Sequence, residues 1–129
     1  MAGIVAAEAN RLLDASFGRV AYVAPTTPMR LALATTANTD SAAGTEVTGG
    51  SYARQDLDMG TAAANKQIPN SASEAFTNMP AVTVTHIDIY DAAATPRRAW
   101  YGPLTTARTL AAGDTLSFAA AAITASIGV

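Results

Sequence analysis

The chain has 129 residues, of which 50% are apolar, 6% aromatic and 14% charged; its formal net charge is −2 and it has no cysteine. This length predicts one domain over residues 1–129, and the lack of cysteine excludes disulfides, thiolate catalysis and thiolate metal sites. The seven arginines are scattered from Arg11 to Arg108 and form no basic stripe, which disfavours nucleic-acid binding.

The first predicted element is a short helix over residues 3–17. From Ile4 to Ser16 apolar residues recur at helical spacing, with Glu8 and Arg11 on the opposite face, and Gly18 follows as a terminator. We expect the apolar face to pack on the rest of the domain, with docking on a partner as the alternative. No basic segment precedes the apolar run, so we expect no secretory signal.

After the helix the apolar pattern changes to a period of two, which predicts strands. In chain order the expected strands are 29–34, 51–58, 82–90, 98–106, a hairpin over 109–118 that turns at Ala111–Asp114, and 123–127. Pro103 suggests an edge position or a break in its strand. A phase change near Thr85 predicts a bulge, and the small and polar residues 37–51 predict a surface loop.

These elements predict a mainly β fold: an antiparallel β-sandwich or jelly-roll-like domain with one short N-terminal α-helix. Strands and helices do not alternate, so a parallel sheet is not expected. The apolar C-terminal stretch, residues 118–129, is shorter than the roughly 20 residues of a membrane helix, and we expect no membrane partner.

Three segments carry a family resemblance: GTEVTGGSYARQ at 44–55, THIDIYDA at 85–92, and GPLTTARTL with GDTLSFA between 102 and 119. In this order they resemble a family of short bacteriophage virion proteins, labelled tail fibre, head decoration or minor capsid proteins. The resemblance spans nearly the whole chain and implies a structural protein of the virion.

The residues of these segments also make sense as parts of a fold. We interpret six as fold-defining: Gly49, Gly50, Tyr52, Arg54, Gly113 and Asp114. The glycine pair gives backbone freedom where a loop enters a strand, and Tyr52 can bury its ring while its hydroxyl stays at the rim. The Gly-Asp pair supplies a turn. Such residues hold a fold together and do not indicate catalysis.

No constellation of residues predicts an enzyme or a cofactor. His86 is the sole histidine, so one chain cannot build a two-histidine metal site or a histidine relay, and we interpret it as structural. Asp56 with Asp58, and Asp88 with Asp91, could contribute to a calcium site, but neither pair completes a ligand set. A paired-carboxylate glycosidase site has no supporting aromatic platform beyond Trp100 and Tyr101. We therefore predict no metal, no cofactor and no enzymatic activity.

The candidate interface is the cluster of Arg97, Arg98, Trp100 and Tyr101. Tryptophan, tyrosine and arginine are enriched at interface hot spots. In the alternative interpretation Trp100 fills the core of this aromatic-poor domain. Alternation along a strand sends the two rings to opposite faces, so we expect one ring in the core and the other exposed.

The leading hypothesis is a capsid decoration or minor capsid protein on the capsid surface of the virion, made in the bacterial cytoplasm. It would cement neighbouring subunits through many weak contacts. Its partners would be the major capsid protein and other copies of itself, in a trimer or larger oligomer if it assembles. The competing hypothesis is a tail fibre or tail-tip module that binds a host receptor; the sequence has neither the long repeats of a fibre shaft nor an evident aromatic-lined site.

Overall fold

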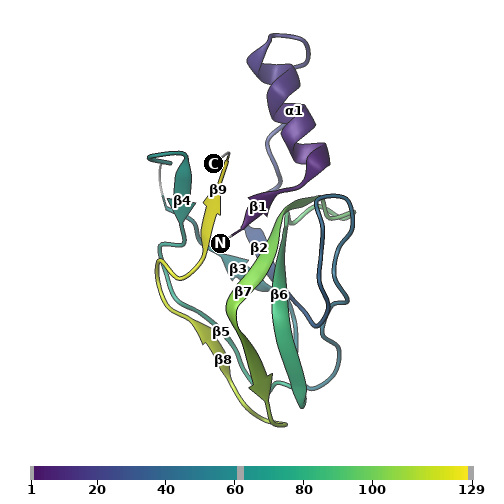
Figure 1. Ribbon diagram of the computed structural model, residues 1–129, viewed down its shortest axis with the longest axis vertical. Coiled ribbons are helices and arrows are strands. Elements are labelled where there is room, and N and C mark those ends of the chain that lie inside the picture. The colour runs from purple at the N-terminus through teal and green to yellow at the C-terminus, as the bar shows by residue number, and fades with distance from the viewer. Residues whose placement is uncertain (1, 61–62, 128–129) are drawn as a thin grey trace.

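Five strands form one antiparallel sheet in the order β1-β7-β6-β2-β3. The computed structural model describes residues 2–60 and 63–127 (Figure 1). The strands of this sheet are β1 (Gly3–Ile4), β2 (Met29–Ala34), β3 (Gln55–Leu57), β6 (Val82–Tyr90) and β7 (Arg98–Leu110). The long strands β6 and β7 pair along most of their length.

Two short ladders form the second layer. β4 (Gln67–Pro69) pairs with β9 (Thr124–Ser126), and β5 (Glu74–Phe76) pairs with β8 (Leu116–Phe118); both ladders lie to the left of β7 in Figure 1. Phe76 of β5, Leu116 of β8 and Ile123, which directly precedes β9, belong to the same buried cluster as residues of β2 and β6. The predicted fold class is confirmed: the chain is mainly β and antiparallel, with one short helix, in a layered arrangement consistent with a sandwich.

The central strand β2 is buried on both faces. Leu31 and Leu33 belong to the apolar cluster, and Ala32 and Ala34 are also at most 2% exposed. Small side chains on the second face allow the loop that follows β2 to approach closely: a Cβ added at Gly44 would lie 2.9 Å from the Ala34 Cβ. The large residues of the alternating pattern therefore pack into the apolar core, and the small residues on the other face pack against the loop.

The regular strand patterns give the most accurate predictions. β2 and β6 occupy the predicted residues, and the register shifts between Val84 and His86, where the bulge was expected. The predicted strand 51–58 is reduced to Gln55–Leu57, and β7 runs beyond 106 to Leu110. The strands β1, β4 and β5 are only two or three residues long and were not predicted.

The predicted hairpin over 109–118 is wrong, although its turn forms. The backbone N–H of Gly113 donates to the Met79 carbonyl (2.8 Å), and the Met79 N–H donates to the Asp114 carbonyl (2.9 Å). The segment before β6 is thus bound beside the turn, and the strands on either side diverge. As a result β8 pairs with β5 instead of β7.

The helix α1 spans Ala6–Ser16, shorter than the predicted 3–17, because Gly3 and Ile4 pair with Tyr101 and Trp100 as β1. The expectation that its apolar face packs on the domain is wrong. Glu8 is the buried residue of this helix, and Leu13 is 57% exposed. Figure 1 shows α1 standing away from one end of the sheets. No helix in the described ranges is long and apolar enough to cross a membrane.

Candidate interaction surface

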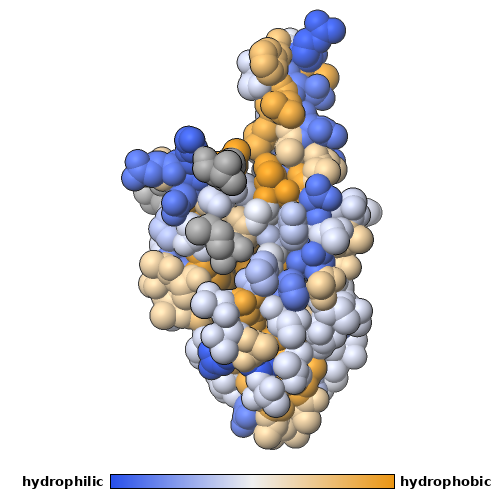
Figure 2. Space-filling view, viewed as in Figure 1, coloured by the Kyte–Doolittle hydropathy of each residue, from blue (hydrophilic) through white to orange (hydrophobic). Residues whose placement is uncertain are grey.

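Helix α1 and the returning segment 17–23 together form a projection that we call the arm (residues 6–23). Of the six large apolar side chains that are exposed in the described chain, five belong to the arm: Leu13 (57%), Phe17 (78%), Val20 (60%), Tyr22 (38%) and Val23 (71%). The sixth is Ile127 (48%). Figure 2 shows hydrophobic side chains along the arm beside hydrophilic ones. This concentration of exposed apolar groups makes the arm the candidate interaction surface.

The arm is tied to the sheet by the carboxylate of Glu8, which is 2% exposed. Arg97 Nη2 donates to Glu8 Oε1 (2.8 Å), Arg11 Nη1 donates to Glu8 Oε2 (3.1 Å), and the Tyr22 hydroxyl also donates to Glu8. Arg97 Nη1 donates to the Val23 carbonyl (2.9 Å). Arg97 therefore clamps both halves of the arm, the helix and the returning segment.

Tyr22 takes part in this clamp as a hydrogen-bond donor. Its burial and its hydrogen bond with Glu8 raise the pKa of the Tyr22 hydroxyl above the ordinary value. The hydroxyl therefore stays protonated at neutral pH, and it can donate to the carboxylate while it accepts from Arg97 Nη2 (3.1 Å).

The four residues predicted as an interface lie on or just before β7, next to the base of the arm. Arg97 clamps the arm, and Arg98 Nε donates to Asp88 Oδ1 (2.7 Å). Trp100 is half-buried against the apolar cluster, and Tyr101 is half-buried with the Arg98 guanidinium 5.3 Å from its ring centroid. Both guanidiniums are thus engaged within the chain itself.

Sequence reasoning missed the exposed residues of the arm beyond Gly18. The available signal was the apolar run Val20–Val23. It follows the helix terminator Gly18, and it belongs neither to the predicted helix nor to a predicted strand.

The GTEVTGGSYARQ segment is explained by a network around the Glu46 carboxylate. The Tyr52 hydroxyl donates to Glu46 Oε2 (2.7 Å), and Arg54 donates through Nε to Oε2 (3.0 Å) and through Nη2 to Oε1 (2.9 Å). The same Tyr52 hydroxyl accepts from the Leu33 backbone N–H (3.0 Å). Burial would raise the pKa of Glu46, but the hydrogen bonds from Arg54 and Tyr52 outweigh it and lower that pKa. The network fixes the loop against the central strand β2.

Two further contacts reinforce this network. The Tyr52 ring stacks on Phe76 with centroids 5.9 Å apart, and the Arg54 guanidinium lies 3.9 Å from the centroid of the Tyr90 ring. Burial raises the pKa of the Tyr52 hydroxyl well above its ordinary value. The segment therefore joins residues of both layers of the fold.

Three glycines of the motifs occupy positive-φ positions. Gly49 and Gly50 have φ of +103° and +55°, and a Cβ at Gly50 would lie 2.6 Å from the Asn78 carbonyl oxygen. Gly113 has φ of +90° in the turn after β7, where Asp114 Oδ2 accepts from the Ala111 N–H (2.8 Å). These contacts give the motif residues structural roles, since each closes a loop or a turn.

Two of the four aspartates considered as calcium ligands, Asp88 and Asp91, accept hydrogen bonds inside the chain. Asp88 accepts from Arg98, from Asn38 Nδ2 (3.0 Å) and from the Gly44 N–H (3.2 Å). Asp91 accepts from three backbone N–H groups, and although burial would raise its pKa, these bonds lower it. Asp56 lies 3.5 Å from Arg30. Within residues 2–60 and 63–127 no three acidic or histidine side chains are grouped to hold a metal ion.

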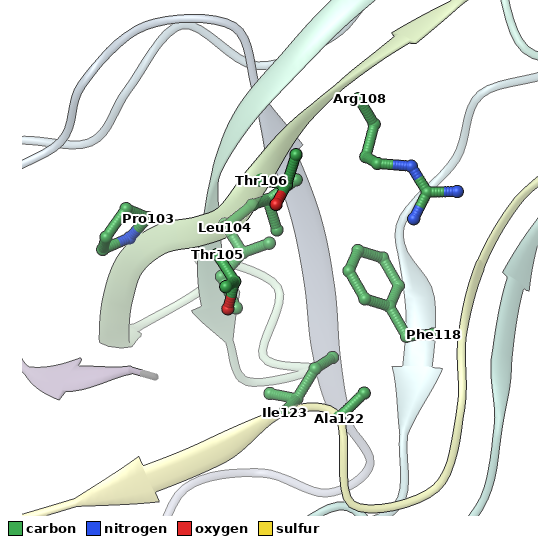
Figure 3. A pocket seen from close by; sticks show the side chains of 9 residues that line it. Pro103, Leu104, Thr105, Thr106, Arg108, Phe118, Ala122 and Ile123 are labelled. Atoms are coloured by element: carbon green, nitrogen blue, oxygen red, sulfur yellow. The ribbon is translucent and has the colours of Figure 1, made fainter.

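A shallow cavity of about 240 Å³ opens beside a bulge in β7. Between the pairs Val84–Arg108 and His86–Pro103, four residues of β7 (104–107) lie opposite one residue of β6, and such a bulge redirects side chains. Figure 3 shows the Arg108 side chain extending toward the Phe118 ring, with threonines on the β7 wall. Arg108 is the sole ionisable side chain among the lining residues. This lining offers no acid–base pair for catalysis.

The chain matches a protein family described as Podophage GP4 fiber I protein gp80 over residues 3–126. The match includes the arm, both layers of strands and the three motif segments. A search of the curated proteins found no match.

Proposed function

The chain belongs to the Podophage GP4 fiber I protein gp80 family, and on that premise we propose that it is a non-catalytic fibre subunit of a bacteriophage virion. Its work is to bury surface against neighbouring subunits of the particle. The family description favours a fibre over the capsid decoration that the sequence alone suggested.

The observation that carries this proposal is the arm, which presents five exposed large apolar side chains on a small domain. Isolated exposed apolar residues are common on soluble proteins, but their concentration in one segment is typical of protein–protein contacts. The clamp of Glu8 and Arg97 holds the arm in place before any partner arrives. Preorganisation of this kind lowers the entropy lost on binding.

The cavity next to β7 supports the non-catalytic part of the proposal. Its lining combines one guanidinium with threonine hydroxyls and apolar groups, a set that can contact a ligand but holds no nucleophile–base pair. Thr105, Thr106 and Arg108 are exposed and lie outside the arm, so any host contact at this cavity would use a separate part of the chain.

Cryo-electron microscopy of the virion tests the location. We expect density that fits this domain in fibres attached to the tail. Density in a regular lattice over the capsid shell would overturn the fibre assignment in favour of capsid decoration. Absence of the chain from purified virions, measured by mass spectrometry, would contradict both.

A further inference from the structure

The isolated chain exposes more surface than a compact monomer of its mass. Its accessible surface is 7,102 Å², whereas a monomer of 13.1 kDa is expected to expose about 6,400 Å². The arm contributes to this excess of about 700 Å², because Glu8 is the one residue of α1 that is buried. The large apolar side chains of the arm are therefore not covered by the rest of the chain.

We infer that the arm binds the arm of a second copy of this chain. This inference rests on the proposed function in one respect: it assumes that the protein acts by binding other subunits. It names the partner that the proposed function leaves open.

The distribution of apolar residues favours arm-to-arm contact. In the described part of the chain, exposed large apolar side chains outside the arm reduce to Ile127. If the arm docked elsewhere on a second copy, Phe17 and Val23 would meet a surface on which Ile127 is the one exposed large apolar side chain of the described residues. Contact between two arms covers apolar groups with apolar groups, and it is self-complementary, as a twofold interface requires.

The charges of the arm allow it to meet its own copy. Residues 6–23 contain two acidic side chains, Glu8 and Asp14, and two basic ones, Arg11 and Arg19, so the arm has no net charge. Glu8 and Arg11 pair within the arm. Asp14 and Arg19 are exposed, carry opposite charges and have no ion-pair partner in the described chain. Two identical arms therefore do not repel each other.

The area is sufficient for a specific complex. If each copy covers its excess of about 700 Å², the pair buries about 1,400 Å², within the roughly 1,200–2,000 Å² of stable interfaces. Because the Glu8–Arg97 clamp already orders the arm, little of the binding energy is spent on folding it.

The test is the mass of the full-length chain in solution, measured by light scattering and sedimentation over a range of concentrations. We expect an assembly of at least twice the 13.1 kDa chain. Phe17→Glu and Val23→Glu remove side chains that are 78% and 71% exposed, so they leave the monomer folded. Each should weaken association about tenfold or more. Ile127→Glu is the matched control: it changes an exposed apolar residue outside the arm, and association should be unchanged.

Hydrogen exchange on the unaltered chain gives an independent measurement, in which protection of residues 6–23 should rise with protein concentration. A chain that stays monomeric at all concentrations would overturn the inference. So would an assembly that survives both arm substitutions, or one that Ile127→Glu dissociates equally. None of these results changes where the chain lies in the virion, so the fibre assignment is judged separately by microscopy. Loss of the variants from virions while the free chain is monomeric would assign the arm to a different virion protein.

Discussion

The carboxylate of Glu46 organises a loop that sequence patterning alone would leave without structure. It accepts one hydrogen bond from Tyr52 and two from Arg54, and through the Tyr52 hydroxyl it is connected to the backbone of β2 at Leu33. A two-point contact between a guanidinium and a carboxylate fixes geometry as well as energy. The polar residues of this motif therefore hold the fold together and need no ligand to explain them.

Replacement of this carboxylate has an effect that depends on pH. Because the pKa of Glu46 is lower in the folded chain than its ordinary value of 4.5, its charged form stabilises the fold above that value, and this stability is lost as the pH falls through the folded-state pKa. Glu46→Gln should therefore lower the free energy of unfolding at pH 7 by about 1 kcal/mol. Urea denaturation at pH 7 and at a series of acidic pH values measures the difference, which should shrink below pH 4.5.

Asp56→Asn is the control for this series, because Asp56 is largely exposed and only 3.5 Å from Arg30. It should change the free energy of unfolding by less than about 0.5 kcal/mol at any pH. A loss for Glu46→Gln that persists undiminished in acid would show that the amide disturbs packing rather than a charged network.

Among the elements, α1 depends most on a single distant residue. It has 11 residues, and a helix of this length is marginal by itself in water. Arg97 connects it to the sheet by contacts with Glu8 and with the Val23 carbonyl. Arg97→Ala should therefore release the arm and leave the sheets intact, because a freed Glu8 carboxylate returns to water instead of staying buried without its partner.

Hydrogen exchange measured by mass spectrometry checks this expectation: amides of residues 6–23 should exchange at least about tenfold faster, as a loss of roughly 1.4 kcal/mol of local stability implies. Arg108→Ala is the control: Arg108 lies on β7, the strand that Arg97 directly precedes, and its side chain is exposed and has no ion-pair partner in the described chain. Unchanged exchange in the arm, or faster exchange throughout the sheets, would contradict the clamp.

The arm also shows where prediction from sequence stops. Periodicity identified a helix here, and strict alternation located β2 and β6, because local spacing determines those features. Periodicity cannot say whether an apolar face is covered by its own chain. Glu8 was placed on the polar side, and the residue that buries it lies 89 positions away. The pairing of β8 with β5 is likewise decided by the bonds of Met79 with the turn at Gly113, a contact that no local pattern encodes.

At the scale of the molecule, the arm and the body are held by different interactions. The apolar cluster draws on the strands of both layers, and it contains no residue of the arm. The arm is joined to the body by backbone bonds at its base, such as Val5 N–H to the Ala99 carbonyl (3.0 Å), and by the charged clamp at Glu8. Apolar burial supplies most of the stability of a domain, so the body should not need the arm in order to fold.

A variant in which residues 6–23 are replaced by a short glycine–serine linker tests this division. The linker joins two anchored ends, since Val5 is bonded to Ala99 and Thr26 accepts from the Ala92 N–H (2.8 Å). The midpoint of thermal unfolding, followed by the fluorescence of the single tryptophan, Trp100, should stay within about 4–8 °C of the unaltered chain, which corresponds to roughly 1 kcal/mol. Because Trp100 packs against the apolar cluster, its signal reports the body rather than the arm. A variant that fails to unfold cooperatively would mean that the arm belongs to the folding unit, and the separation of a self-sufficient body from a binding element would then be wrong.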